Sequence, residues 1–251
     1  TLTVSDEKYI NDIILNAKID STWPSLSVSK RISCINKFRK ELLKNKKEIA
    51  STIKNETGKI DFDITVEILT SLEHLKQIAS IAKKALKIQR RNAGLMKTKK
   101  AYVKYEPLGV AGVIAPWNYP LATPLTSSSE ALIAGNNVIL KPSEHTPLTS
   151  KLLKKIWDNT IEYKNAFQVV IGGADVGESI VKNSDIDIVC FTGSTFVGRI
   201  IAKQCAETLK PCILELGGKD PMIVLNDANI HRAVESAIFG GMSNACLLYT
   251  S

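Results

Sequence analysis

Apolar residues recur at helical spacing through the first part of the chain. An apolar residue returns every three or four positions, the period that places side chains on one face of an α-helix. Helices are therefore predicted in residues 10–17, 32–42, 49–53 and 64–86. Gly58 is suited to end a helix, and the polar run at 89–94 predicts a turn. We expect these helices to pack against the rest of the fold and to carry no catalytic or binding residues.

After residue 100 the pattern changes to short apolar runs rich in β-branched residues. Residues 101–106 alternate between apolar and polar, which predicts a strand with one polar face. Buried strands are predicted at 110–115, 138–140, 167–171, 186–191 and 212–215. Helices fit the gaps between them. Thr146 and Pro147 are residue types that begin helices, and further helices are predicted to begin near Thr195 and to span 233–244.

Strands that alternate with helices imply βαβ units in a parallel sheet that is covered on both faces. We therefore predict an α/β fold with a doubly wound parallel sheet, the Rossmann-like arrangement that binds dinucleotides. The chain has 251 residues, of which 44% are hydrophobic, enough for one large domain or one domain and the start of another. No apolar run approaches the ~20 residues of a membrane-spanning helix, and the first residues lack the order of a signal peptide. A soluble, cytoplasmic protein without a membrane partner is expected.

The net charge of +8 raises the question of a nucleic-acid partner. Lysines in segments such as 37–47 and 76–87 alternate with apolar residues, which is typical of solvated helix faces, so no nucleic acid is expected. The dense basic run at 97–100 falls in a segment expected to be an exposed β-ribbon. The five cysteines have no C-x-x-C spacing and the three histidines are isolated, so we expect reduced thiols and no metal site.

Asn118 follows a predicted strand and lies between Pro116 and Pro120, a rigid setting for an uncharged amide. When a nucleophile adds to a carbonyl, negative charge develops on the oxygen. A fixed side-chain N–H at that point can be worth ~3 kcal/mol of barrier. Asn118 is therefore a candidate oxyanion donor; an asparagine that caps a turn is the alternative interpretation.

Glu215 ends a predicted apolar strand and precedes Leu216 and two glycines. We expect its carboxylate to be partly desolvated, which would raise its pKa toward the range of a general base. The alternative is a buried structural glutamate.

Two more strand ends carry residues suited to a nucleotide. Gly193 and Ser194 precede a predicted helix, where backbone N–H groups and a hydroxyl can bind a phosphate. Lys141 and Glu144 follow another strand, where an ammonium and a carboxylate can bind ribose oxygens and hydroxyls. Glu144 would repel a 2′-phosphate, which favours NAD. Taken alone, each pair is also explained as an ordinary strand-to-helix turn or a surface charge pair.

Four segments in order, 116–120, 140–144, 191–194 and 215–221, together resemble the NAD(P)-dependent aldehyde dehydrogenase family along nearly the whole chain. The resemblance implies oxidation of a small-molecule aldehyde, and a full-length form that is a homo-oligomer. It also implies a division of the chain into an NAD(P)-binding domain (1–88 and 108–217), an oligomerisation ribbon (89–107) and the start of a catalytic domain (218–251). NAD is the expected cofactor, and NADP is also accepted by some family members that have this glutamate.

Residue roles follow from the same resemblance. Asn118 and Glu215 would be catalytic, with Glu215 activating the water that hydrolyses a thioester. The residues implied in cofactor binding are Pro116, Trp117, Lys141, Glu144, Gly173, Gly177, Phe191, Gly193, Ser194, Val197, Leu216 and Gly217. Retention of Glu215 argues against relatives that acylate coenzyme A, because those do not need water activation.

The catalytic thiol of the family lies in a Gly-Gln-x-Cys segment. An ungapped alignment from Glu215 places it at Tyr249, whereas Cys246 lies three positions earlier without the Gly-Gln lead. We therefore assign Cys246 no role and expect a truncated chain without aldehyde oxidation. The alternative function is a non-catalytic nucleotide-binding or interaction protein on the same scaffold.

Overall fold

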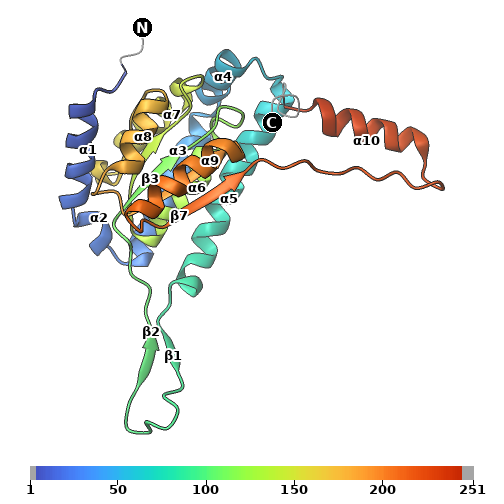
Figure 1. Cartoon of the computed structure of the whole chain (residues 1–251). Coiled ribbons are helices and arrows are strands. Elements are labelled where there is room, and N and C mark those ends of the chain that lie inside the picture. Colours follow the sequence, from blue (N-terminus) through green and yellow to red (C-terminus); the bar gives the residue numbers. More distant parts are fainter. Residues whose placement is uncertain (1–3, 245–251) are drawn as a thin grey trace.

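A five-stranded parallel sheet forms the centre of the protein, whose computed structural model describes residues 4–244 (Figure 1). The strand order is β5-β4-β3-β6-β7, so the order reverses between β3 and β6, the neighbours at the centre of the sheet. The strands are β3 (Val110–Ile114), β4 (Asn137–Lys141), β5 (Phe167–Val169), β6 (Ile188–Gly193) and β7 (Cys212–Leu216). The predicted α/β fold with a parallel sheet is confirmed.

Successive residues of each central strand enter different cores on the two faces of the sheet. In β4, Val138 and Leu140 pack in one hydrophobic cluster, and Ile139 between them packs in the other. Helices α3 (Val28–Lys44), α5 (Asp61–Ala85), α6 (Ala122–Ala134) and α7 (Pro147–Thr160) contribute to the first cluster. Helices α1 (Glu7–Ile19), α8 (Ala174–Lys182) and α9 (Thr195–Glu207) contribute to the second. The sheet is therefore doubly wound, as predicted.

The helices predicted in the first part of the chain are present. Short α2 (Thr22–Ser25) and α4 (Lys46–Thr57) complete this part. Gly58 ends α4 with φ 68°, a left-handed conformation that glycine adopts without strain. The buried Trp23 and Trp157 rings meet edge to face at 5.7 Å, so an aromatic contact joins α2 to α7.

A two-stranded ribbon extends away from the sheet (Figure 1). Strands β1 (Gln89–Arg91) and β2 (Ala101–Val103) pair antiparallel. The prediction of a turn at 89–94 is therefore wrong for residues 89–91. These residues are extended and pair with β2. The strand predicted at 101–106 ends at Val103. Leu95 and Met96 are exposed at the end of the ribbon.

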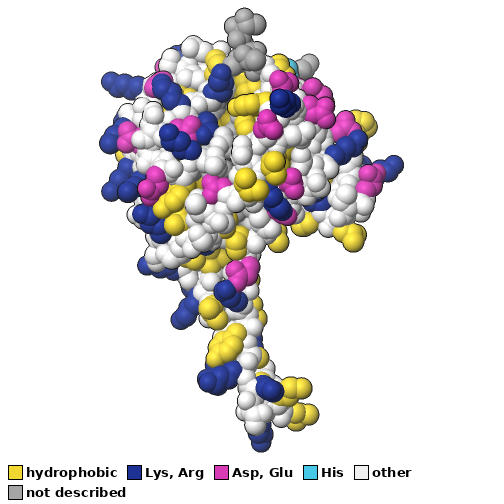
Figure 2. All heavy atoms as spheres, turned by 90° about the vertical axis from the view of Figure 1, so that its left-hand side faces the viewer, with side chains coloured by type: hydrophobic (Ala, Val, Ile, Leu, Met, Phe, Trp, Pro, Cys, Tyr) yellow, Lys and Arg dark blue, Asp and Glu magenta, His cyan; other side chains and the backbone are white. Residues whose placement is uncertain are grey.

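Lysine and arginine side chains are scattered among acidic ones on the face that Figure 2 presents. This distribution agrees with solvated helix faces. Within residues 4–244, no helix combines the length and apolar character needed to cross a membrane.

Beyond β7 the chain leaves the body as an extended arm and then forms α10 (Ile230–Met242), which has no buried residue (Figure 1). The helix predicted at 233–244 is thus present but begins three residues earlier. Ile223 and Phe239 are among the exposed apolar side chains of this arm and helix. The short helix η1 (Lys164–Ala166) lies directly before β5.

Candidate cofactor and active site

An open pocket of about 1320 Å³ lies at the carboxyl ends of the central strands. Its walls come from the segments that follow β3, β4, β6 and β7, and it spans the point at which the strand order reverses. Open α/β sheets bind their ligands in such crevices. All of the site residues predicted from sequence line it: Pro116, Trp117, Asn118, Lys141, Glu144, Gly173, Gly177, Phe191, Gly193, Ser194, Val197, Glu215, Leu216 and Gly217.

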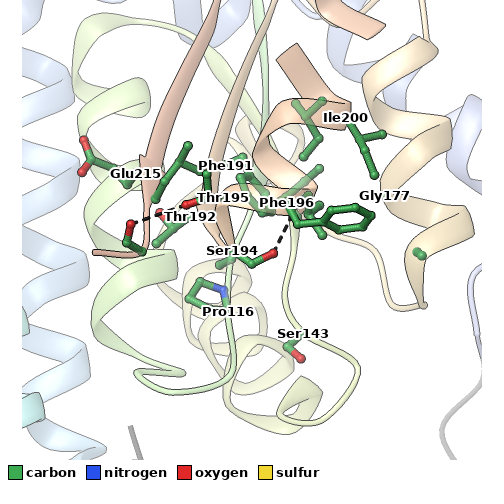
Figure 3. Close-up of a pocket in the computed structure, with 18 of the residues that line it drawn as sticks. Pro116, Ser143, Gly177, Phe191, Thr192, Ser194, Thr195, Phe196, Ile200 and Glu215 are labelled. Atoms are coloured by element: carbon green, nitrogen blue, oxygen red, sulfur yellow. Dashed lines mark hydrogen bonds between the residues drawn. The ribbon is translucent and has the colours of Figure 1, made fainter. Parts of the chain in front are cut away.

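The β6–α9 connection supplies the start of a helix to the pocket. Ser194 is the N-cap of α9, and its Oγ accepts a hydrogen bond of 3.3 Å from the N–H of Val197 (Figure 3). The first N–H groups of a helix have no partners within it, and the helix dipole favours an anion there. A Cβ at Gly193 would lie 2.5 Å from Cζ of Phe191, so glycine lets the ring pack against the backbone. This corner is suited to a phosphate group.

A buried lysine and an exposed carboxylate occupy the β4 end of the pocket. Nζ of Lys141 donates to the carbonyl of Pro142 at 2.8 Å and lies 3.6 Å from the Glu144 carboxylate. Burial lowers the pKa of Lys141 from its usual value, and the charge of Glu144 offsets part of this effect. Burial alone would raise the pKa of Glu144, but its own backbone N–H and the charge of Lys141 together lower it. Glu144 therefore presents a stable anion to the pocket.

Gly173 and Gly177 lie on the same side, at the start of α8. Gly173 is the N-cap of this helix, and Gly177 faces the aliphatic part of Lys141, whose Cδ would be 3.6 Å from an added Cβ. That distance is ordinary van der Waals contact. The packing of the protein itself therefore does not require a glycine at position 177.

Asn118 lies in the connection between β3 and α6. Its Oδ1 accepts a hydrogen bond of 3.0 Å from the N–H of Tyr119. Its amide oxygen is thus engaged by the N–H of the next residue, which is not the contact to a residue two or three positions on that caps a turn. Among the residues described, Nδ2 of Asn118 has no acceptor, so one end of the amide is held and the other is available to donate.

Glu215 lies at the opposite end of the pocket from Gly177 (Figure 3). The side chain is exposed, so the expectation of a partly desolvated carboxylate is wrong for residues 4–244. The reason is that β7 is an edge strand whose outer part has few neighbours, and the following arm leaves the body. Next to it, the N–H of Gly217 donates to the carbonyl of Gly193 at 3.2 Å, which fixes the turn after β7 against β6.

Several pocket residues were not predicted from sequence. Phe196 and Ile200 stand four positions apart on α9, both exposed, and form an apolar wall (Figure 3). Across from them, Glu178 of α8 accepts a hydrogen bond of 3.2 Å from Gln204 of α9. The sequence signal for this wall is the pair of apolar residues four positions apart in the first two turns of the helix that follows Gly193 and Ser194.

Four cysteines lie within residues 4–244, and none of them lines the pocket. Burial raises the pKa of Cys190 to about 11, with a further contribution from the charge of Glu130. Such a thiol is a poor nucleophile at neutral pH. Cys246 and Tyr249, which concern the catalytic thiol, lie outside the described residues.

The sequence matches known proteins of a single family along most of its length. A sequence profile described as "Aldehyde dehydrogenase family" matches residues 1–246. Betaine aldehyde dehydrogenase of Vibrio vulnificus is 33% identical over 93% of this chain and 48% of its own length. Benzaldehyde dehydrogenase [NAD(+)] of Pseudomonas putida is 36% identical over 91% of this chain and 47% of its own. The chain thus spans about half the length of these relatives.

Solved structures agree with the sequence matches. An aldehyde dehydrogenase of Mycobacterium tuberculosis, complexed with NAD+, superposes with a TM-score of 0.92 at 31% identity, over 97% of this chain and 51% of that one. An NADP-dependent enzyme of E. coli superposes with a TM-score of 0.90 at 29% identity, over 95% of this chain and 50% of that one. Both nicotinamide cofactors therefore occur among proteins that share this fold.

Proposed function

Because this chain belongs to the aldehyde dehydrogenase family, we propose that it forms the cofactor-binding part of an enzyme that oxidises an aldehyde to a carboxylic acid. The observation that carries the proposal is the pocket after the central strands, which gathers the four sequence motifs into one site. Residues 1–88 and 108–217 would be the NAD(P)-binding domain. Residues 89–107 would be the oligomerisation ribbon, and residues 218–251 the first part of a catalytic domain.

The residues present fit a dinucleotide. NAD(P) supplies the hydride acceptor when it is bound. Ser194 and the first turn of α9 would hold the pyrophosphate, because that turn offers N–H groups and the positive end of the helix dipole. Lys141 and Glu144 would orient the adenosine ribose. The anionic Glu144 disfavours a 2′-phosphate, so NAD is the proposed cofactor and NADP the weaker ligand.

The chemistry proposed for the chain uses two residues. Nδ2 of Asn118 would donate a hydrogen bond to the aldehyde oxygen as a thiolate adds to the carbonyl carbon. This addition gives a thiohemiacetal, which becomes a thioester once its hydride has been transferred to bound NAD(P). Glu215 would then accept a proton from the water that attacks the thioester, which releases the carboxylic acid and the thiolate. The thiol must come from outside residues 4–244, since no cysteine of that part lines the pocket. An ungapped alignment from Glu215 places that thiol at Tyr249, so we propose that the 251-residue chain binds the cofactor without oxidising aldehydes.

Calorimetric titration of the chain with NAD+ tests this proposal. One binding site per chain is expected, and Gly193→Ala should weaken it roughly tenfold, because overpacking against Phe191 costs about 1–3 kcal/mol. Absence of NAD+ binding would remove the proposal. Steady NADH formation from aldehydes by this same chain would contradict the inactivity. Binding without turnover, in a protein that is also complete at this length, would favour the non-catalytic alternative.

A further inference from the structure

A buried ion pair lies behind the segment that carries Asn118. Nζ of Lys59 is 2.7 Å from Oε2 of Glu67, and their side chains are 2% and 0% exposed. Every other ion pair within residues 4–244 has at least one side chain more than a quarter exposed. Burying two charges is costly, and a hydrophobic pair of similar volume often stabilises a fold as well or better. The pair therefore calls for an explanation other than stability.

Its remaining contacts all lead to the connection between β3 and α6. Oε1 of Glu67 accepts hydrogen bonds from the N–H groups of Leu121, at 2.9 Å, and Ala122, at 3.1 Å. These are backbone groups at the start of α6, which has no side-chain cap of its own. The ammonium of Lys59 lies 4.3 Å from the centroid of the Tyr119 ring. Glu67 and Lys59 thus hold the residues that directly follow Asn118.

A second connection reaches Asn118 from the same helix. The N–H of Asn244 donates to Oδ2 of Asp63 at 3.0 Å, and Nδ2 of Asn244 donates to the carbonyl of Asn118 at 3.2 Å. Asp63 and Glu67 lie one turn apart at the start of α5. The backbone of Asn118 and the residues after it are therefore attached to one rigid element at several points.

We infer that the Lys59–Glu67 pair is a positioning device that sets the direction of the Asn118 side-chain amide in the pocket. This inference rests on the proposed role of Asn118 as an oxyanion donor. Such a donor acts only if it is preorganised, because reorganisation during the reaction would consume the stabilisation that it provides. The charged pair supplies what an apolar pair cannot: a carboxylate that accepts from two backbone N–H groups, and a cation beneath the Tyr119 ring.

The test uses the 251-residue chain and nuclear magnetic resonance. Glu67→Gln should speed hydrogen exchange at the Leu121 and Ala122 amides by about tenfold or more, the scale of losing a hydrogen bond to a charged acceptor. The ¹⁵N side-chain signal of Asn118 should shift and broaden, while amides of β4 stay within about twofold of the parent. Lys59→Arg should leave the exchange rates at Leu121 and Ala122 closer to the parent values than Glu67→Gln does, since it keeps a cation beside the Glu67 carboxylate. Asp61→Asn is the matched control, because Lys54 and Asp61 form an exposed pair of 2.8 Å at the start of the same helix.

An unchanged Asn118 signal in Glu67→Gln, or exchange that rises equally in β4, would overturn the inference. If Glu67→Gln does not fold, two substitutions of the half-exposed Tyr119 decide. Tyr119→Leu removes the ring and should shift the Asn118 signal, whereas Tyr119→Phe keeps the ring and should not. Equal behaviour of these two variants would also overturn it. Because the spectra are recorded without NAD+ and without an aldehyde, the result does not depend on cofactor binding. Absence of NAD+ binding in the separate titration would instead count against the proposed function.

Discussion

Leu216 at the end of β7 packs directly onto Gly198 of α9. A Cβ on Gly198 would lie 2.4 Å from Cδ2 of Leu216, closer than any side-chain contact tolerates. Leu216 also lines the pocket, one position after Glu215. Because Gly198 has no side chain, the end of β7 can lie this close to α9. The helix whose first turn forms the phosphate corner and the strand that carries Glu215 are therefore in contact through this pair.

Gly198→Ala should displace Leu216, and overpacking at about 1–3 kcal/mol should outweigh the ~1 kcal/mol that alanine adds to a helix, so the free energy of unfolding should fall by up to about 2 kcal/mol. NAD+ affinity should fall with it, measured by calorimetry beside urea unfolding. Gly240→Ala in α10 is the matched control, since an added Cβ there meets nothing within 4 Å. It should leave NAD+ binding unchanged. Parent-like values for Gly198→Ala would mean that Leu216 relaxes without affecting the pocket.

Cofactor preference should depend on Glu144. A carboxylate near the ribose would repel a 2′-phosphate, so NAD should bind about tenfold more tightly than NADP, and Glu144→Gln should narrow the difference. Calorimetry with both nucleotides measures this. Glu48→Gln is the control: Glu48 pairs with Lys155 outside the pocket and is 52% exposed, as Glu144 is. Equal affinities in the parent chain would remove the argument for NAD.

Glu215 should act in deacylation and not in hydride transfer. In a protein that carries this chain together with the catalytic thiol, Glu215→Gln should keep a single-turnover burst of NADH. Steady turnover should fall on the order of 10²-fold, a typical loss for a general base. Rapid-quench and steady-state assays separate the two. Glu207→Gln, at the far end of α9, should alter neither rate. Loss of the burst would place Glu215 in thiol activation or cofactor positioning.

Stability should decline in alkaline solution because of Cys190. Burial raises the pKa of its thiol from 9.0 to about 11, so the folded protein holds a proton that the unfolded chain releases. This contribution is fully present below pH 9 and is lost as the pH rises toward about 11. Urea unfolding of the parent and of Cys190→Ser at several pH values tests this: the decline should be smaller in the variant. Parallel curves for the two proteins would contradict the shifted pKa.

The order of helices and strands was predictable because periodicity is a local property. Ile139 between Val138 and Leu140 needs no distant partner to be recognised as a buried strand residue. The sites after the strands followed from one topological rule, and they do line one pocket.

Contacts between distant segments were not predictable. Thr146 was expected to cap α7, yet its side chain makes no capping hydrogen bond. Glu56 does so instead, accepting from the N–H groups of Leu148, at 2.5 Å, and Thr149, at 2.9 Å. The exposure of Glu215 was likewise missed, because burial of a strand end depends on what packs over it and not on the residues beside it in sequence.

The first helix packs on parts of the chain that are made much later. Lys18 pairs with Asp187 at 2.6 Å, and the N–H of Ser5 donates to the carbonyl of Ile171 at 2.8 Å. At synthesis rates of about 5–20 residues per second, α1 leaves the ribosome roughly 10–30 s before these partners exist. Its apolar face, with Ile10 and Ile14, can already meet Val110 and Ile139 of β3 and β4 by then, because all four residues belong to one hydrophobic cluster. The N-terminal segment can therefore make its last two anchoring contacts only after residues 171–187 have been synthesised.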